Sequence, residues 1–555
     1  MDEHTAAQSP RVSVGADAQV DALVKTSPRV RIVRRARQGS MNRSTSIGIR
    51  IIAACVGLAV ADAWAGACES LASLDLKDTK IAIAEVVPAG GYKPTKEFFM
   101  PMPPNTYSSL PAFCRVAGAI SPVRDSDIAF EVWLPIDAWN GKLVAVGNGG
   151  YSGEIWFPFM AGPLAAGYVA AGTDTGHQGS AVDASFALKH PEKVVDFGSR
   201  AVHELTLKSK AIVVAFYGSP PRRAYWNGCS TGGRQGLMEA QRYPADFDGI
   251  VAGAPANYMT RLSAKYVVAA QTIHKEGGLI PPEKLPMLHR AVLDACDLID
   301  GVKDGVIENP LRCAFDPASL KCTDVDGPNC LTAPQVASAA ALYGPMINPR
   351  TDVNLFPGVS AGSEIYWATG VGPMVSQPTP LVTGIFEYIV FQKKGWDWKT
   401  FDIARDMNKA EDVAGPTLDA IDPNLTAFFD RGGKLLQYHG WADPGIPPLN
   451  SIGYYESVRA ALDDPQLDRS YRLFMVPGMD HCAGGEGPNR FDALGALDVW
   501  METGKPPESI VATRTNKDGA VDRTRPLCPY PKVAIYRGDG SSDDAANFTC
   551  ALDAH

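Results

Sequence analysis

Short apolar stretches alternate with amphipathic segments on both sides of a long middle region. The runs at 142–146 and 167–171 are typical of buried strands. Between 202 and 216 the apolar positions recur every three or four residues, which predicts a helix. Further strands are expected at 223–227, 434–439 and 472–476. Strands that alternate with helices indicate an α/β fold with a doubly wound, mostly parallel sheet, whose ligands bind at the carboxyl ends of the strands.

The middle region breaks this alternation. Residues 257–431 are rich in proline, glycine and acidic turns, with amphipathic helical pieces between them. We expect a lid domain there, inserted between a first core segment at 68–256 and a second at 432–555. Lids exclude water from a site and supply walls that select the substrate.

The N-terminal part of the sequence is typical of an export signal. Positive charge at Arg43 and Arg50 precedes an apolar core at 51–60 and alanine-rich cleavage sites, so 41–67 is expected to be a signal peptide. Residues 1–40 are expected to be a disordered leader or to lie upstream of a true start at Met41. One of the eleven cysteines falls in the signal, and the even remainder favours an oxidising compartment, secreted or periplasmic.

Composition and charge limit the kinds of partner that this protein can bind. The chain has 555 residues, 45% of them hydrophobic, which is enough for a large core. Its net charge of −9 argues against nucleic acid or an anionic membrane surface as a partner. No run of twenty uncharged apolar residues follows the signal, so no membrane span is expected. The oligomeric state cannot be predicted from the sequence.

A Gly-x-Ser-x-Gly pattern marks the main chemical candidate. Ser230 is its serine, between the expected strand at 223–227 and a helix-favouring run at 235–242. A sharp strand-to-helix turn exposes such a serine to a substrate carbonyl, and glycines relieve the crowding. Ser230 is therefore predicted to be a nucleophile in acyl transfer.

A serine nucleophile needs a base and an acid, which in α/β-hydrolases follow it in the order acid, then histidine. The histidines downstream are His274, His289, His439, His481 and His555. The first two lie in a polar helical stretch of the insert, the last ends the chain, and His439 precedes the best acid candidate. This leaves His481, which follows the strand at 472–476. Asp443 follows the strand at 434–439 in the same way, and we predict it to be the acid.

Two cysteines flank this set. Cys229 precedes Ser230, and Cys482 follows His481. If these turns meet in space, the two cysteines can bond and hold the catalytic groups in position.

The oxyanion of an acyl transfer needs preorganised backbone donors. One normally comes from the residue after the nucleophile, here Thr231. The glycine-rich turn at 146–151 suits the second, with Gly150 as the first choice and Gly149 as the fallback. An ordinary tight turn is the alternative for this segment.

The motifs at 228–235, 439–443 and 480–482, with 196–204 and 241–250, resemble the tannase and feruloyl esterase family from about residue 68 onward. The resemblance implies an α/β-hydrolase fold with an inserted lid and a small aromatic ester as substrate. Feruloyl esterase activity is the leading expectation. The alternatives are a tannase and a terephthalate monoester hydrolase, although Thr231 stands where the latter branch has glutamate. A silent calcium-dependent binding protein on a hydrolase scaffold is a remote alternative, because the Ser-Asp-His set is intact.

An acidic stretch of the insert suggests a metal ion. Asp297, Asp300 and Asp304 would repel one another unless a cation lies among them, and calcium takes carboxylate and carbonyl oxygens. With the carbonyls of Val302 and Val306 they are similar to the family's lid calcium loop. We expect a structural Ca²⁺ there and no organic cofactor; a solvated acidic turn is the alternative.

The resemblance also suggests how the cysteines pair and where specificity lies. The expected disulfides are Cys68–Cys114, Cys229–Cys482, Cys296–Cys313, Cys322–Cys330 and Cys528–Cys550. Aromatic residues at 366–367, 386–388 and 396–398 are expected either to line the substrate site or to form the core of the lid.

Overall fold

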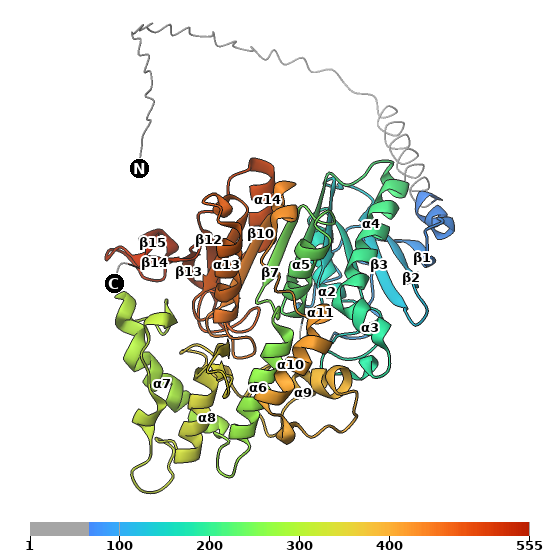
Figure 1. Ribbon diagram of the computed structural model, residues 1–555. Coiled ribbons are helices and arrows are strands. Elements are labelled where there is room, and N and C mark those ends of the chain that lie inside the picture. Colours follow the sequence, from blue (N-terminus) through green and yellow to red (C-terminus); the bar gives the residue numbers. More distant parts are fainter. Residues whose placement is uncertain (1–65, 99, 101, 554–555) are drawn as a thin grey trace, which may run out of the picture. The chain divides into compact units, whose positions relative to one another are not determined.

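A computed structural model describes residues 66–98, 100 and 102–553 (Figure 1). The predicted leader at 1–40 and nearly all of the predicted signal peptide at 41–67 lie outside the described residues. No helix among the described residues is long and apolar enough to cross a membrane.

Nine strands of the described chain form one sheet. They are β1 (Thr79–Val87), β2 (Phe113–Ile120), β3 (Ile128–Pro135), β4 (Lys142–Val146), β5 (Val169–Thr173), β6 (Arg223–Cys229), β7 (Gly249–Gly253), β10 (Lys434–Gly440) and β11 (Tyr471–Val476). Their order is β1-β2-β3-β5-β4-β6-β7-β10-β11. The three pairs from β1 to β5 are antiparallel, and every pair from β5 to β11 is parallel. The predicted mostly parallel sheet is confirmed.

The parallel strands are buried on both faces, which explains their continuous apolar runs. Leu143 and Ala145 of β4 pack into one hydrophobic cluster, whereas Val144 and Val146 pack into another. Successive side chains of a strand point to opposite faces, so the sheet separates two cores.

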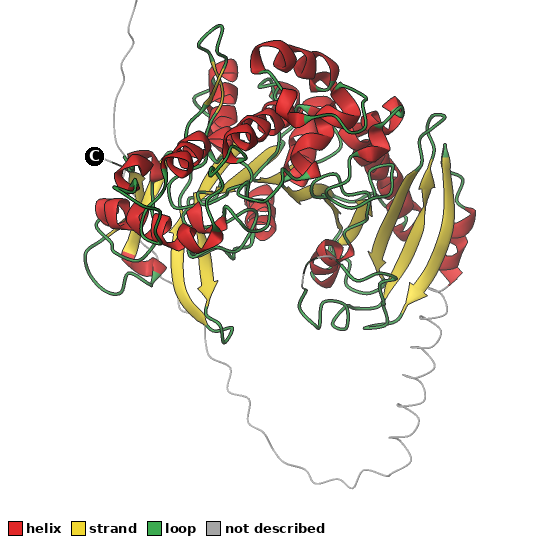
Figure 2. Cartoon of the chain, turned by 90° about the horizontal axis from the view of Figure 1, so that it is seen from below, coloured by secondary structure: helices red, strands yellow, loops and turns green. Residues whose placement is uncertain are grey.

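Helices cover both faces of the sheet (Figure 2). On one side lie α4 (Ala201–Tyr217), α5 (Thr231–Arg242) and α13 (Leu449–Leu462). On the other lie α2 (Phe157–Ala165) and α14 (Ala493–Thr503). The helix predicted at 202–216 is α4, which ends at Gly218 with φ 75°, the left-handed conformation that glycine adopts readily.

The chain leaves the sheet between β7 and β10, as the predicted insertion requires. Its elements there are α6 (Met259–Ile273), α7 (Leu285–Cys296), α8 (Ala333–Tyr343), β8 (Met346–Ile347), β9 (Asn354–Phe356), α9 (Pro380–Gly384), α10 (Ile403–Val413), α11 (Gly415–Leu418) and α12 (Thr426–Asp430). Trp367 and Phe386 are fully buried in hydrophobic clusters of this segment. These two aromatics therefore belong to the core of the inserted segment, and its role as a lid stays a prediction. The borders at 257 and 431 stay predictions.

Two small hairpins follow the sheet and were not predicted. They are β12 (Ile510–Thr515) with β13 (Val521–Leu527), and β14 (Lys532–Tyr536) with β15 (Phe548–Leu552). The short helix α3 (Pro191–Val195) precedes α4. The hairpins matter for the site because arginines of β13 reach the acidic loop of the insert.

Candidate active site

Ser230 lies in the sharp turn that its sequence pattern predicts. It is the one residue between β6 and α5, with φ 64° and ψ −123°. This conformation is costly for a residue with a side chain, and such strain is concentrated at functional sites. A Cβ atom on Gly228 would lie 2.6 Å from the Gly232 carbonyl oxygen. The close approach of these two residues explains the glycines that flank the serine.

Asp443 and His481 come from neighbouring parallel strands. Asp443 follows β10 and His481 follows β11, so both lie at the carboxyl edge of the sheet. The Nδ1 atom of His481 lies 2.7 Å from Oδ2 of Asp443. Asp443 is fully buried, whereas the His481 side chain is 14% exposed and accessible from solvent. The backbone amides of Gly445 and Ile446 donate to the other carboxylate oxygen at 2.8 and 2.9 Å.

Charge and burial act against each other in this pair. Burial alone would raise the pKa of Asp443, but the facing charge of His481 and hydrogen bonds from His439 and His481 outweigh it and lower the pKa. Burial alone would lower the pKa of His481, and the charge and hydrogen bond of Asp443 raise it instead. The carboxylate therefore stays ionised and stabilises a protonated imidazole.

A disulfide brings the serine turn to the histidine turn. Cys229 and Cys482 are bonded, with 5.9 Å between their Cα atoms and a sequence separation of 253. Each is the direct neighbour of Ser230 or His481. Both side chains are described, and the Ser230 hydroxyl forms no hydrogen bond with the His481 ring. Such contacts are often long without substrate and tighten when it binds.

The remaining predicted disulfides are also present. The described residues contain Cys68–Cys114, Cys296–Cys313, Cys322–Cys330 and Cys528–Cys550. All five predicted pairings are confirmed in the structure.

The predicted oxyanion donors lie together. Thr231 is the first residue of α5, where an amide has no partner within the helix. Its hydroxyl donates to the Gly150 carbonyl at 2.9 Å, which ties the glycine-rich turn to the serine turn. Gly150 has φ +55°, and a Cβ there would lie 2.2 Å from the Ala181 carbonyl oxygen. Neither the Gly149 nor the Gly150 amide donates to another described residue, so both remain candidates for the second donor.

The predicted calcium loop is closed by the Cys296–Cys313 disulfide. The Asp297 carboxylate accepts hydrogen bonds from the amides of Asp304 and Gly305, at 3.2 and 3.0 Å. Asp300 accepts from the Val302 amide at 2.9 Å. Burial, followed by the like charges of Asp304 and Asp297, raises the pKa of Asp300 to about 6. Burial is the largest cause, so the loop holds a carboxyl group that is poorly solvated as an anion.

Arginines from the C-terminal hairpin compete for part of this charge. Arg525 forms an ion pair with Asp304, and Arg523 lies 3.4 Å from the same carboxylate oxygen. Of the groups of potential ligands that lie close together among the described residues, Cys322–Asp326–Cys330 has its sulfurs in a disulfide, which leaves His203–Glu239–Asp246. The three loop aspartates do not form such a group. Asp297 and Asp300 are therefore the loop carboxylates that form no ion pair with a described residue, and the carbonyls of Val302 and Val306 stay predicted ligands.

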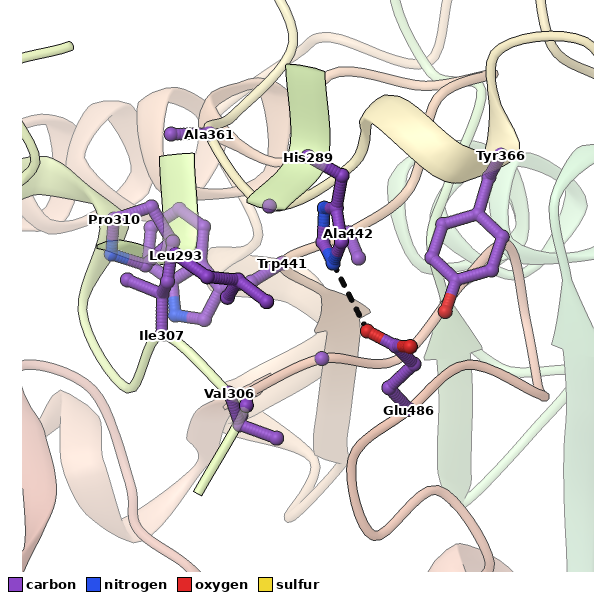
Figure 3. Close-up of a pocket in the computed structure, with 13 residues that line it drawn as sticks. His289, Leu293, Val306, Ile307, Pro310, Ala361, Tyr366, Trp441, Ala442 and Glu486 are labelled. Atoms are coloured by element: carbon purple, nitrogen blue, oxygen red, sulfur yellow. Dashed lines mark hydrogen bonds and ion pairs between the residues drawn. The ribbon is translucent and has the colours of Figure 1, made fainter. Parts of the chain in front are cut away.

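His289 joins the insert to the loop that follows His481 (Figure 3). Its Nδ1 lies 2.7 Å from Glu364 and its Nε2 lies 3.0 Å from Glu486. A carboxylate can only accept, so both ring nitrogens carry protons and the imidazole is a cation. Although burial opposes this, hydrogen bonds to Glu364 and Glu486 raise the pKa of His289 to about 9. Sequence analysis missed this contact because its three residues are far apart in the chain.

The cavity beside His289 is not the substrate site. It has a volume of about 10 Å³, which is room for about one water molecule. Trp441, Ala442 and Tyr366 are among its lining residues, whereas Ser230 and His481 are not (Figure 3).

Because His289 is a cation, the free energy of unfolding is expected to fall at alkaline pH. Its folded-state pKa of about 9 exceeds the ordinary 6.5, so its contribution is complete below pH 6.5 and is lost as the pH rises through 9. Relative to a His289→Gln variant, the wild type should lose about 3 kcal/mol of unfolding free energy between pH 6 and pH 10. Urea unfolding at several pH values measures this difference. A difference that stays constant with pH contradicts the assignment of a cation.

Comparison with known proteins adds independent information. Residues 114–551 match the model of a family described as tannase and feruloyl esterase. An uncharacterized esterase of Xanthomonas campestris pv. campestris is 37% identical over 549 residues, which cover 90% of this chain and 94% of that protein. Feruloyl esterase B of Aspergillus niger is 32% identical over 463 residues, which cover 79% of this chain and 86% of the relative.

A solved structure agrees with these sequence matches. The crystal structure of feruloyl esterase B from Aspergillus oryzae superimposes with a TM-score of 0.81 at 29% sequence identity. The match covers 88% of this chain and all of the other. The fold of most of this chain is therefore similar to that of a known esterase.

Proposed function

The chain belongs to the tannase and feruloyl esterase family, and from this premise we propose that it hydrolyses esters of hydroxycinnamic acids such as ferulate. It is a carboxylic ester hydrolase with an α/β-hydrolase fold, not a binding protein on a silent scaffold. The observation that carries the proposed mechanism is the Asp443–His481 hydrogen bond, joined through the Cys229–Cys482 disulfide to the strained turn of Ser230.

In the proposed reaction, His481 takes the proton of the Ser230 hydroxyl, and the serine oxygen attacks the ester carbonyl. The amides of Thr231 and Gly150 stabilise the oxyanion, and His481 returns the proton to the leaving alcohol. Water, activated by the same imidazole, then releases the acid from the acyl-enzyme. Asp443 holds the ring with Nδ1 protonated and Nε2 free to act as base, and it stabilises the imidazolium that forms.

The substrate class is supported by the named relatives. The Aspergillus niger and Aspergillus oryzae proteins are both feruloyl esterases, and their matches cover most of this chain. A gallate ester is the second candidate, since the family model includes tannases by name.

A hydrolysis panel tests this choice. Purified protein is assayed with methyl ferulate, methyl gallate and a terephthalate monoester, with Ser230→Ala as the blank. We expect the largest kcat/KM for methyl ferulate. A larger value for one of the other esters assigns the chain to that branch of the family.

The disulfide next to the catalytic groups is expected to affect turnover more than folding at moderate temperature. Replacing Cys229 and Cys482 together by alanine frees two turns that must meet, and a displacement of about 1 Å costs about 10²-fold in rate. We expect kcat to fall by about that factor. The matched control replaces Cys322 and Cys330, a disulfide within the insert, and should leave kcat nearly unchanged. Equal effects of the two double variants would argue against a role for Cys229–Cys482 in positioning.

We propose that the loop around Asp297 and Asp300 binds a structural Ca²⁺. The like charges of Asp297 and Asp304 beside Asp300, on a loop that a disulfide closes, support this, and calcium would neutralise part of that charge. Titration calorimetry on protein treated with a chelator should show one site, and chelation should lower the melting temperature by several degrees. Asp300→Asn should abolish the heat of binding and make the melting temperature insensitive to chelator. No heat and no change in melting temperature would leave the solvated acidic turn as the correct interpretation.

Export to an oxidising compartment is part of the proposal. Five disulfides among the described residues support a secreted or periplasmic location, in agreement with the predicted signal peptide. Cell fractionation with N-terminal sequencing of the mature protein tests it, and a start near residue 68 is expected.

A further inference from the structure

A second histidine contacts the acid of the proposed triad. His439 lies near the end of β10 and is fully buried. Its Nε2 is 3.2 Å from Oδ2 of Asp443 and 2.9 Å from the carbonyl oxygen of Ile446. Its Nδ1 is 2.7 Å from the hydroxyl of Ser451, at the start of α13. The family mechanism described above does not use this side chain.

The partners of His439 determine where its proton lies. The Ile446 carbonyl and the Asp443 carboxylate can only accept hydrogen bonds, so Nε2 must carry a proton. The Ser451 hydroxyl can then donate to Nδ1 of a neutral ring. His439 is thus a hydrogen-bond donor through Nε2, and its proton lies between the Asp443 carboxylate and the Ile446 carbonyl.

The carboxylate of Asp443 has four donors around it. Amides of Gly445 and Ile446 occupy Oδ1, and His481 and His439 both approach Oδ2. Since His439 also binds the Ile446 carbonyl, it closes the turn 443–446 on the carboxylate that the turn carries. Rotation of the carboxylate away from His481 would also break its contact with His439, whose ring is held in place by the Ile446 carbonyl and the Ser451 hydroxyl.

We propose that His439 is a positioning residue, which holds the Asp443 carboxylate in the orientation that orders His481. This inference rests on the proposed triad of Ser230, Asp443 and His481. His439 does not touch the reacting atoms; it acts through Asp443.

Two substitutions distinguish the hydrogen bond that His439 donates from the packing of its ring. His439→Gln carries an amide that can reach the Nε2 position and donate there, whereas His439→Phe keeps a buried ring without any donor. We expect His439→Phe to lower kcat by about 10²-fold, as for a small misplacement of a catalytic group, with KM changed less than about threefold. His439→Gln should recover kcat to within about tenfold of the wild type.

The assay uses the full chain with methyl ferulate, and rates are divided by the active sites titrated with a fluorophosphonate. This correction removes losses that come only from unfolded protein. If His439→Phe does not fold, His439→Asn provides the comparison, because its shorter amide cannot reach Asp443. Wild-type kcat in the donor-free variant overturns the inference, and so does an equal loss in the Gln and donor-free variants.

Failure of the proposed function would look different. If Ser230→Ala kept its esterase activity, the triad itself would be wrong, whatever the His439 variants showed. If Ser230→Ala is inactive and His439→Phe is normal, the triad stands and only the role of His439 fails.

Discussion

Replacing Ser230 by alanine is expected to lower kcat by about 10⁶-fold. The hydroxyl oxygen is the atom that attacks the ester carbonyl in the proposed reaction, and alanine offers no substitute. The strained turn, the disulfide and the Asp443–His481 hydrogen bond involve other atoms and should remain. Steady-state hydrolysis of methyl ferulate measures the loss, and circular dichroism checks that the fold is unchanged.

A buried serine outside the site provides the matched control. The Ser209 hydroxyl, in α4, is fully buried and has no hydrogen-bond partner among the described residues. Ser209→Ala should therefore leave kcat unchanged. Esterase activity close to that of the wild type in Ser230→Ala would mean that another group is the nucleophile.

Replacing Asp443 by asparagine is expected to lower kcat by about 10⁴-fold. The asparagine is almost the same size, but it carries no charge, and its NH₂ group cannot accept the His481 Nδ1 proton. The imidazole then loses both the partner that selects its tautomer and the charge that raises its pKa. The measurement is kcat with methyl ferulate, at a pH where the wild type is fully active.

Asp463→Asn is the control for this change. Asp463 is exposed after α13 and has φ 46°, a conformation that asparagine tolerates. It should keep wild-type kcat. If Asp443→Asn retained more than about a tenth of the activity, His481 would be ordered by some other group, and the proposed acid would be wrong.

Much of the candidate site could be predicted because its signals are local. The glycines beside Ser230 indicate a crowded turn. Asp443 and His481 each follow an apolar run, which indicates that they lie at the ends of strands. Parallel strands bring their carboxyl ends to one edge of a sheet, so position along the chain was enough to predict that these groups meet.

Other features could not be predicted, because they depend on pairs of residues that no local pattern links. The antiparallel pairing of β1, β2 and β3 extends a sheet whose strand–helix alternation predicted only its parallel part. The C-terminal hairpins and the contact of Arg525 with Asp304 are of the same kind. The sequence allowed aromatics such as Trp367 to line the substrate site or to form the core of the insert. The burial of Trp367 in the structure decides for the core.

The sequence by itself determined the serine turn, the order of the three catalytic candidates and the cysteines beside them, because turn geometry and strand ends depend on a few neighbouring residues. Only the tertiary structure decided that His439 shares Asp443 with His481, and that His289 lies between Glu364 and Glu486. A histidine's proton and charge depend on which acceptors surround it after packing. Those acceptors come from segments up to 197 residues apart, whose meeting is a property of the folded chain.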